Sequence, residues 1–475
     1  MSQSGSQSGS QSGSAPSAAA LSAVFKAYDV RGTVPDQVDE DLARAVGAAF
    51  VEVTGAAESG VVAGYDMRPS SPGLARAFAD GASAAGADVT LIGLASTDEL
   101  YFASGRLGVP GAMFTASHNP AQYNGIKLCR AYAVPLGMDT GLGDVRDLVA
   151  AGSATPSATP SATPPRRGTV VERDLLEEYA EHLRSLVPVT GRRLVAAVDA
   201  GNGMAGHTAP AVLGKLDLEL VPMYFELDGT FPNHEANPIE PANLADLQAR
   251  VREVGADLGL AFDGDADRCF IVDERGEIVS PSALTALIAS RELAREPGAT
   301  VIHNLITSRA VPELVTALGG TPVRTRVGHS FIKATMAETD AIFGGEHSGH
   351  FYFRDFWRAD SGMLAALHVL AALAETDRPL SHLLAEFERY VATGEINSTV
   401  SDQAAVVAEL EREYAGRPGV RVDHLDGLTV AHEDWWFNVR PSNTEPLLRL
   451  NAEAADQVTL DRLRDDVLAT IRRDP

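Results

Sequence analysis

The sequence LGLAFDGDADR, residues 258–268, indicates the fold more clearly than any other part of the chain. It opens with apolar and small residues and stops abruptly at a polar loop, which is typical of a buried strand. Asp263, Asp265 and Asp267 then alternate along that loop. Because ligands of open α/β sheets bind beyond the carboxyl ends of the strands, the stretch predicts an α/β sheet with a functional loop at its edge.

The rest of the chain repeats this alternation of apolar strands and amphipathic helices. Strand-like runs and helical patterns interleave, the strands at 61–65, 89–94, 112–114 and 194–198 and the helices at 40–51 and 244–254. Such alternation predicts βαβ units and mainly parallel or mixed sheets. The end of the chain differs. A strand at 394–400, a helix at 403–414, two short strands and a final helix predict a separate α+β domain.

A chain of 475 residues is too long for one hydrophobic core, so several domains are expected. Linkers and loop signals predict a disordered tail and four domains, with boundaries at 1–20, 21–167, 168–276, 277–389 and 390–475. The tail repeats SQSG, and the first domain ends in a surface insert in which SATP recurs over 153–164. Neither segment has the apolar residues that a core requires.

Composition and charge exclude several classes of function. With 45% hydrophobic and 22% charged residues, the chain is typical of a soluble globular protein. No apolar run approaches the ~18 residues of a membrane helix, and the N-terminus lacks the features of a signal peptide. The net charge of −25 would repel nucleic acid and anionic membranes. Cys129 and Cys269 lie in apolar runs, which favours buried thiols in a reducing cytoplasm over a disulfide or a zinc site.

The aspartates of the acidic loop, residues 263–268, can converge on one cation. Carboxylate oxygens are hard ligands, which favours Mg²⁺ or Ca²⁺ over zinc. A calcium-binding EF-hand also begins with alternating aspartates, but it requires glycine where Arg268 stands and a helix before the loop. A phosphatase-like site with Asp263 as nucleophile and Asp265 as acid fits the same pattern. A solvated acidic turn is the simplest alternative.

The sequence FTASHNP, residues 114–120, places a serine after another apolar run. Ser117 would stand at the carboxyl end of a strand, with His118 beside it to orient the hydroxyl. The spacing fits neither a Ser-His-Asp triad nor the G-x-S-x-G elbow, and a helix-capping serine is an equal alternative. A turn at Asn124-Gly125 is expected to reverse the chain and bring Lys127 toward Ser117.

Two further motifs are suited to binding a sugar and a phosphate. GGEHSGH, residues 344–350, has glycines that permit a close approach and offers Glu346 and Ser348 to sugar hydroxyls. RPSNTEP, residues 440–446, combines Arg440 with hydroxyl and amide side chains, which is the chemistry of a phosphate site. A glycine-rich hairpin and an ordinary polar turn are the respective alternatives.

Along the chain the motifs occur in the order FTASHNP, DGDADR, GEHSGH and RPSNTEP. Together they resemble the motifs of the α-D-phosphohexomutase superfamily, and specifically its phosphomannomutase/phosphoglucomutase branch. The resemblance begins at FKAYDVRG, residues 25–32, and extends to about residue 454, outside the tail and the SATP insert. It implies three related α/β domains and a C-terminal α+β domain around a central cleft. The implied reaction interconverts mannose 1-phosphate and mannose 6-phosphate, and glucose phosphates too, through a phosphoserine and a hexose 1,6-bisphosphate.

The same resemblance implies a role for each motif residue. Ser117 would carry the phosphate and, with Asp263, Asp265 and Asp267, hold Mg²⁺. The implied catalytic residues are Ser117, His118, Lys127 and Arg31. The implied substrate-binding residues are Tyr28, Arg268, His329, Glu346, His347, Ser348, Gly349, His350, Arg440, Ser442, Asn443 and Thr444. The implied partners are small hexose phosphates, without nucleic acid or membrane, for a cytoplasmic monomer or homodimer.

Single residues suggest the branch. The aminosugar-directed branch usually has glutamine in the middle of the sugar motif and a GTDGIRG-like start, whereas this chain has His347 and AYDVRG. One departure lies in VIHNLITSR, where related sequences often carry a basic residue and this chain has Ile306. A contact to the substrate phosphate is therefore either missing or supplied by Arg309.

The residues alone leave two other functions open. One is an aspartyl-phosphate phosphatase or mutase centred on Asp263, and the other is a protein that binds calcium or a sugar phosphate without turnover. Mild base or hydroxylamine would separate the first from a phosphoserine enzyme, because both reagents cleave an acyl phosphate and release its phosphate. Turnover of mannose 1-phosphate would separate the second.

Overall fold

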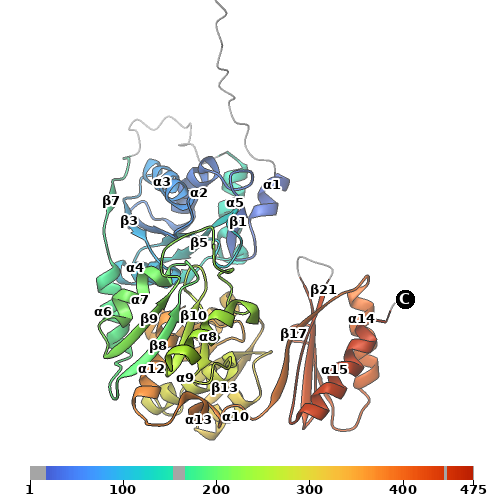
Figure 1. The fold of residues 1–475 in the computed structure, drawn as a ribbon. Helices are drawn as coiled ribbons and strands as arrows, with labels where there is room; N and C mark the ends of the chain where they lie inside the picture. The colour runs from blue at the N-terminus through green and yellow to red at the C-terminus, as the bar shows by residue number, and fades with distance from the viewer. Residues whose placement is uncertain (1–17, 153–165, 443–446, 474–475) are drawn as a thin grey trace, which may run out of the picture.

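In the part of the chain that the structure describes, four sheets follow one another along the sequence (Figure 1). The computed structural model describes residues 18–152, 166–442 and 447–473. The expectations for residues 1–17 and for the SATP repeats therefore lie outside the described residues. Residues 18–20, which the sequence placed in the tail, instead begin helix α1 (Ala18–Val24).

The first sheet has the strand order β1-β5-β4-β2-β3-β7, with β6 paired to β5. Its bounds are β1 (Asp29–Thr33), β2 (Val61–Tyr65), β3 (Val89–Leu94), β4 (Gly111–Phe114), β5 (Tyr123–Arg130), β6 (Val134–Pro135) and β7 (Val170–Glu172). Strands β4, β2, β3 and β7 are parallel, whereas β1 and β5 are antiparallel to their neighbours. Because β7 pairs with β3, the first sheet reaches past residue 167, where the sequence ended domain 1.

Helices cover both faces of this sheet. On one face lie α2 (Glu40–Thr54), α3 (Ser71–Ala84) and α5 (Leu142–Ala150), and on the other lies α4 (Thr97–Leu107). Helix α2 begins where the Asp39 carboxylate caps the backbone N–H of Leu42, and it ends at Gly55 in a left-handed conformation.

The second and third sheets are also mixed. The second has the order β11-β10-β8-β9, and the third has the order β13-β12-β14-β15-β16. The strands of the second are β8 (Leu194–Asp199), β9 (Leu218–Met223), β10 (Leu258–Phe262) and β11 (Cys269–Asp273), with helices α6 (Leu176–Leu186), α7 (Ala205–Leu213) and α8 (Ala245–Val254). The strands of the third are β12 (Thr300–Asn304), β13 (Thr321–Thr325), β14 (Phe343–Gly345), β15 (Phe351–Phe353) and β16 (Ala359–Asp360). Its helices are α9 (Pro281–Arg295), α10 (Ala310–Ala317), α11 (His329–Thr339), α12 (Gly362–Ala374) and α13 (Leu380–Leu384).

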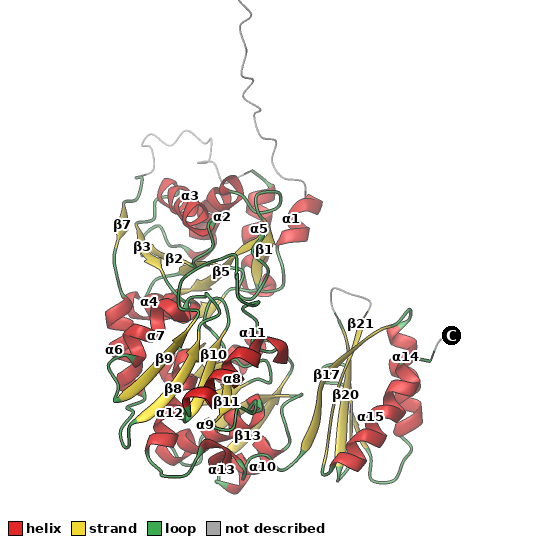
Figure 2. Cartoon of the chain, in the orientation of Figure 1, coloured by secondary structure: helices red, strands yellow, loops and turns green. Residues whose placement is uncertain are grey.

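The fourth sheet is antiparallel throughout, in the order β17-β21-β20-β19-β18. Its elements are β17 (Val391–Thr399), α14 (Gln403–Tyr414), β18 (Arg421–Asp423), β19 (Leu428–Ala431), β20 (Trp435–Pro441), β21 (Leu447–Ala454) and α15 (Gln457–Ile471). Figure 2 shows both helices on the side of the sheet that faces away from the other domains. The predicted fold, three α/β domains followed by an α+β domain, is confirmed.

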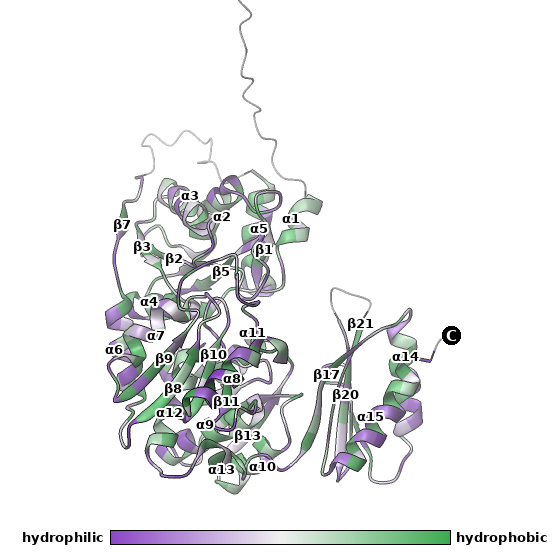
Figure 3. Ribbon diagram, in the orientation of Figure 1, coloured by the Kyte–Doolittle hydropathy of each residue, from purple (hydrophilic) through white to green (hydrophobic). Residues whose placement is uncertain are grey.

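Domains 1, 2 and 3 share one hydrophobic core, to which Met113, Tyr179, Phe262 and Leu367 contribute. Helix α12 is buried along its whole length within this core, which explains why its sequence is apolar on every side. The inner strands of these domains are largely green, and therefore hydrophobic, in Figure 3. Domain 4 has a core of its own.

The structure bears on the expectations for the two cysteines and for membrane-spanning helices. Cys129 and Cys269 are buried and form no disulfide, as predicted. Among the helices that the structure describes, none is both long and apolar enough to cross a bilayer.

Asp98 in α4 is a buried junction between the first three domains. Its Oδ2 atom accepts hydrogen bonds from Tyr179 Oη in α6 at 2.8 Å and from Ser361 Oγ at 2.6 Å, and Ser361 caps α12. Ser96 also donates to Oδ1. Burial raises the pKa of Asp98 to about 6, against an ordinary value of 3.8. The carboxyl therefore favours folding most below pH 3.8, and this contribution is lost as the pH rises through about 6.

Tyr179→Phe should destabilise the folded chain by about 1.5–3 kcal/mol at pH 8, where the buried carboxylate is ionised and loses one of its donors. At pH 5 the folded-state acid is mainly protonated, so the loss should fall to about 0.5–1.5 kcal/mol. Urea unfolding followed by tryptophan fluorescence at both pH values measures the difference.

Tyr224→Phe is the matched control, because the Tyr224 hydroxyl also donates to a carboxylate, Asp246 at 2.7 Å, but in an exposed position. This variant should lose less than about 1 kcal/mol at either pH. Equal losses for the two variants, or a loss in Tyr179→Phe that does not change with pH, would contradict the role given to Asp98.

Candidate active site

Ser117 lies at the carboxyl end of β4, in the serine loop (residues 115–122) that connects β4 to β5. It is buried, and its hydroxyl donates a hydrogen bond of 2.8 Å to Asp263 Oδ2. The Nδ1 atom of His118 lies 3.1 Å from the same hydroxyl. No helix follows Ser117 before β5, so this serine does not cap one. The serine hydroxyl is instead directed at the acidic loop.

A glycine allows the serine loop and the acidic loop to approach each other this closely. A Cβ atom on Gly264 would lie 2.4 Å from the carbonyl oxygen of Ser117, which is a steric clash with backbone. The acidic loop connects β10 to β11, so its aspartates stand at the carboxyl end of a buried strand, as the sequence predicted. The close packing of the two loops therefore requires a glycine at position 264.

The acidic loop brings carboxylate oxygens of Asp263, Asp265 and Asp267 within 4.8 Å of one another. All three residues are buried, so the loop is not a solvated turn. Within the described part of the chain, Asp265 Oδ1 and Asp267 Oδ1 have no hydrogen-bond partner. A buried oxygen without a partner is costly, and a bound cation would satisfy both. The donor set, oxygen only and anionic, fits Mg²⁺.

Two cations offset these carboxylates. Lys127 Nζ donates to Asp265 Oδ2 at 2.7 Å and to Asp267 Oδ2 at 2.6 Å, and Arg268 Nε donates to Asp263 Oδ2 at 2.9 Å. Burial is the largest single influence on Asp267 and would raise its pKa, but Lys127, His350 and Arg268 together outweigh burial and lower that pKa to about 2. Burial alone would lower the pKa of Lys127, yet the two carboxylates raise it, so the lysine stays charged. Burial does raise the pKa of Asp263, although Arg268 opposes the shift.

Lys127 was expected near Ser117, and the structure pairs it with Asp265 and Asp267 of the acidic loop. The turn predicted at Asn124-Gly125 is wrong. Both residues lie inside β5, and the chain reverses earlier, within the serine loop. A Cβ atom on Gly125 would lie 2.3 Å from the carbonyl oxygen of Val30 in the neighbouring strand β1. The glycine therefore permits close strand packing, a use of Asn-Gly that the dipeptide alone does not distinguish from a turn.

Arg31 contacts the serine loop, of which His118 is a part. Arg31 Nη1 donates to Asn119 Oδ1 at 2.7 Å, and its Nη2 atom pairs with Asp29 at 2.5 Å. Burial lowers the pKa of His118 to about 3, and the nearby charges of Arg268 and Arg31 add to the shift. His118 is therefore a neutral imidazole at physiological pH.

Tyr28 extends from the start of β1 toward domain 3. Its ring packs edge-on against Phe331 of α11, with 6.5 Å between the ring centroids. Its hydroxyl lies 3.3 Å from the position that a Cβ of Gly328 would occupy. His329 is the first residue of α11, and its side chain lies outside the described part of the structure.

The sugar loop, residues 344–350, folds against the acidic loop. The carboxylate of Glu346 accepts hydrogen bonds from Tyr352 Oη at 2.7 Å and from Asn304 Nδ2 at 3.2 Å. Gly349 has a φ of +85°, and a Cβ atom there would lie 2.4 Å from the Phe270 ring. The loop is thus a hairpin with buried polar anchors, and a backbone bridge between His350 and Arg268 joins it to the acidic loop.

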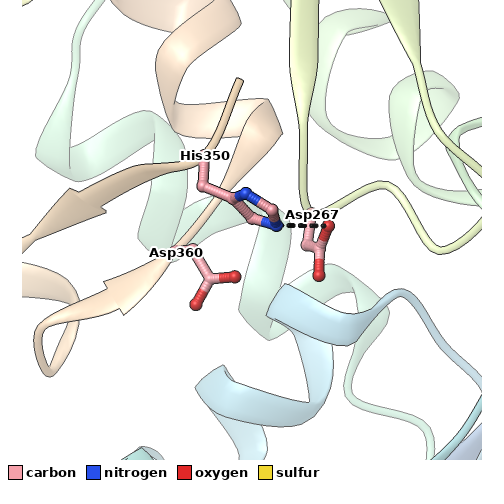
Figure 4. A group of neighbouring side chains, drawn as sticks. All are labelled: Asp267, His350 and Asp360. Carbon is pink, nitrogen blue, oxygen red and sulfur yellow. Dashed lines mark ion pairs between the residues drawn. The ribbon is translucent and has the colours of Figure 1, made fainter. Parts of the chain in front are cut away.

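The side chain of His350 also lies beside the acidic loop (Figure 4). Its Nε2 atom lies 3.6 Å from Asp267 Oδ1, and Ser348 Oγ lies 2.9 Å from its Nδ1 atom. Asp360 stands on the other side of the imidazole in Figure 4. Lys333 already pairs with Asp360 at 2.5 Å, so this second group of acidic residues has a cation from the protein itself.

Arg440 lies in β20 and pairs with Glu395 of β17 at 2.8 Å. Burial lowers the pKa of His347 in the sugar loop, and the charges of Glu395 and Arg440 in domain 4 act on this pKa in opposite directions. Ser442 follows β20 directly. Residues 443–446 of the motif, among them Asn443 and Thr444, lie outside the described residues.

At position 306 the sequence left two alternatives, a missing basic contact to the substrate phosphate or a contact supplied by Arg309. Ile306 is buried against Trp436 in a small apolar cluster between domains 3 and 4. Arg309 Nη2 donates to backbone carbonyl oxygens of domain 4, those of His432 at 2.9 Å and Trp435 at 3.3 Å. Arg309 is therefore engaged in joining the two domains, and the structure favours the alternative in which the basic contact is missing.

Two residues that shape the site belong to no motif recognised in the sequence. Thr97 Oγ1 donates to Asp265 Oδ2 at 2.6 Å, and Arg68 Nη2 donates to the carbonyl oxygen of Ser117 at 2.9 Å. Both follow strands of the first sheet, β3 and β2, which are parallel to each other and to β4. The shared sheet edge was the available signal, because the carboxyl ends of parallel strands meet there.

Models of the phosphoglucomutase/phosphomannomutase domains match the chain in order. The alpha/beta/alpha domains I, II and III match residues 22–151, 177–276 and 280–390, and the C-terminal domain matches 395–470. The matches therefore cover most of the chain and include all four sequence motifs.

Individual proteins agree with these domain matches. The phosphomannomutase of Salmonella typhimurium is 40% identical over 455 residues, which cover 94% of this chain and 98% of that protein. A phosphohexose mutase of Xanthomonas campestris pv. campestris is 40% identical over 452 residues, covering 94% and 99%. The crystal structure of a phosphoglucomutase/phosphomannomutase family protein from Burkholderia thailandensis superposes with a TM-score of 0.85 at 34% identity, covering 94% and 97%. The chain belongs to the phosphoglucomutase/phosphomannomutase family of isomerases.

Proposed function

We propose that this enzyme interconverts the 1-phosphate and the 6-phosphate of mannose, and those of glucose, by way of a phosphate carried on Ser117. The hydrogen bond of 2.8 Å from the Ser117 hydroxyl to Asp263 carries the proposal, because it places a nucleophile beside three buried carboxylates. The names of the Salmonella and Xanthomonas relatives support a hexose phosphate, and the former supports mannose.

Asp263, Asp265 and Asp267, with an oxygen of the phosphate on Ser117, would hold Mg²⁺. The unpartnered oxygens of Asp265 and Asp267 support this assignment. When bound, the ion neutralises the charge that passes between oxygens during phosphoryl transfer. Lys127 and Arg268 add two positive charges to the same loop.

The first transfer breaks the bond between phosphorus and Ser117 Oγ and forms a bond to the free sugar hydroxyl, which loses its proton. The candidates for this proton transfer are Arg31, Lys127, His118 and His350. Among them His118 is a neutral imidazole, which is the form that can accept a proton. The product is a hexose 1,6-bisphosphate. It turns end for end and returns its other phosphoryl group to Ser117, which regenerates the phosphoenzyme. Positioning and charge neutralisation supply most of the catalysis in such reactions.

The remaining motif residues would bind the substrate. The sugar hydroxyls fit the sugar loop, with contacts from Glu346, His347, Ser348, Gly349 and His350. The phosphate that does not react fits the motif in domain 4, with contacts from Arg440, Ser442, Asn443 and Thr444. Further contacts would come from Tyr28, Arg268 and His329. Because either end of the sugar visits the domain 4 site, this site has to bind phosphate tightly and the hydroxyls loosely.

We also propose a cytoplasmic enzyme that acts as a monomer or homodimer. The two buried, unpaired cysteines support a reducing compartment. An aspartyl phosphate at Asp263 is less well supported, because Oδ2 already accepts from Ser117 at 2.8 Å and from Arg268 at 2.9 Å, and Oδ1 accepts from the Arg268 backbone N–H at 3.1 Å.

Ser117→Ala should remove nearly all steady-state turnover without unfolding the protein, because the variant lacks the oxygen that carries the phosphate. Intact mass after incubation with a hexose 1,6-bisphosphate should show an added ~80 Da on the wild type and none on the variant. Ser185→Ala, which removes an exposed hydroxyl from α6, is the control and should keep both properties. Full turnover by Ser117→Ala would exclude the phosphoserine and favour Asp263.

Asp265→Asn should impair activation of the enzyme by Mg²⁺ more than it lowers the affinity for substrate. The variant keeps the shape of the side chain but loses one carboxylate charge, which costs mainly transition-state stabilisation. The Mg²⁺ concentration for half-maximal activity should rise about tenfold or more. Asp144→Asn changes an exposed aspartate of α5 and should leave the curve in place. An unchanged curve for Asp265→Asn would mean that the acidic loop is only structural.

Arg440→Ala should raise the KM for the 1-phosphate and for the 6-phosphate together. The loss of a charge-assisted contact of about 1.5–3 kcal/mol corresponds to roughly one to two orders of magnitude in each KM. Arg412→Ala, on the exposed side of α14, is the control and should change neither KM. A large effect on one substrate alone would show that Arg440 serves a single orientation of the sugar.

A further inference from the structure

We propose that Arg68 is a positioning residue for phosphoryl transfer, which holds the serine loop in the conformation that directs Ser117 at the acidic loop. The inference rests on the proposed role of Ser117 as the phosphate carrier. Arg68 follows β2, and the carboxyl end of β2 lies beside that of β4 in the first sheet. The Arg68 side chain is fully buried, and it forms a buried ion pair with Asp66 at 3.2 Å.

The Arg68 guanidinium uses all of its N–H groups, five in an arginine. Its Nε atom donates to Asp66 Oδ2 at 3.2 Å. The other four N–H groups donate to carbonyl oxygens of the serine loop and of the first residue of β5, namely Ser117 at 2.9 Å, Asn119 at 2.7 Å, Pro120 at 2.9 Å and Tyr123 at 3.0 Å. One cation therefore organises the backbone of the whole reversal between β4 and β5.

This arrangement requires an arginine. Carbonyl dipoles that point toward one centre repel one another, so the loop would open without a positive charge and enough donors at that centre. A lysine could supply the charge, but it has three donors in place of a planar fork of five.

The serine itself needs this support. Ser117 has a φ of +49°, a left-handed conformation that residues other than glycine rarely adopt. Arg68 holds its carbonyl oxygen, while its hydroxyl reaches Asp263. The backbone conformation and the direction of the nucleophile are therefore set together.

A segment of domain 2 closes over Arg68. The Phe231 ring covers the guanidinium, with 5.1 Å between Arg68 Cζ and the ring centroid. A Cβ atom on Gly229 would lie 2.7 Å from Arg68 Cα, so the backbone of this segment also packs directly on the arginine. The same ring lies 3.6 Å from where a Cβ of Gly264 would stand, in the acidic loop. Arg68 thus lies where the serine loop, the acidic loop and the Phe231 segment meet.

Arg68 would act on the rate of transfer and not on substrate binding, because its contacts are to the serine loop, Asp66 and Phe231. A displacement of about 1 Å in a reacting group can cost about 100-fold in rate. The residues proposed to bind the sugar and the distant phosphate lie in other loops. A disturbed serine loop should therefore lower kcat and leave KM nearly unchanged. Dividing the rate by the fraction of folded protein separates this effect from a general loss of stability.

The test compares Arg68→Lys with Arg192→Lys. Arg192 is also partly buried and donates to a carbonyl oxygen, that of Thr376 at 3.0 Å, and to a carboxylate, that of Asp257 at 2.8 Å, but it lies outside the site. In Arg68→Lys we expect kcat to fall about 10- to 100-fold, with KM within about twofold of the wild type. The rate at which a hexose 1,6-bisphosphate phosphorylates Ser117, read by intact mass, should fall by the same factor. Arg192→Lys should keep both parameters within about twofold.

A folded Arg68→Lys enzyme with the kcat of the wild type would overturn the inference, as would a fall in kcat fully explained by loss of folded protein in thermal unfolding. If Arg68→Lys does not fold, Phe231→Leu decides, because it keeps Arg68 and removes only the ring above it. We then expect about three- to tenfold lower kcat at unchanged KM, and an unchanged kcat would overturn the inference. Wild-type turnover without phosphate on Ser117 would instead overturn the proposed function, and this inference with it.

Discussion

The burial of three carboxylates around one serine hydroxyl is the constraint on which the rest of the structure depends. Buried charges are stable only when cations and hydrogen bonds compensate them. Lys127 of domain 1 pairs with Asp265 and Asp267, and Arg268 pairs with Asp263. The compensation therefore spans the first two domains, and the bridge between Arg268 and the sugar loop adds the third. The shared core of these domains gives the charges a common rigid support.

The fourth domain stands apart from that arrangement. It has its own core, and it joins domain 3 through the apolar cluster around Ile306 and Trp436 and through the hydrogen bonds of Arg309. The groups proposed for phosphoryl transfer and the group proposed to hold the distant phosphate thus belong to separately packed units. Such a division suits a reaction in which the chemistry stays in one place while the sugar presents first one end and then the other.

Much of the fold and of the site could be predicted from the sequence, because apolar periodicity and side-chain chemistry are both visible there. The strand at 258–262 and the helix at 403–414 appear with the predicted bounds. The contribution of Arg68 could not be predicted, since it depends on backbone carbonyl oxygens that no pattern of side chains encodes. The turn expected at Asn124-Gly125 failed for a related reason, because only the neighbouring strand shows that Gly125 makes room for backbone.

The central claim is that the phosphoryl group on Ser117 passes to the sugar and that the sugar returns its other one. A single turnover of phosphorylated enzyme with mannose 1-phosphate, quenched at successive times, tests it most directly. The account predicts that Ser117 loses ~80 Da at the rate at which hexose 1,6-bisphosphate appears, and that it regains this mass as mannose 6-phosphate forms. Mannose 6-phosphate produced at the catalytic rate while the phosphate on Ser117 stays unchanged would contradict the account.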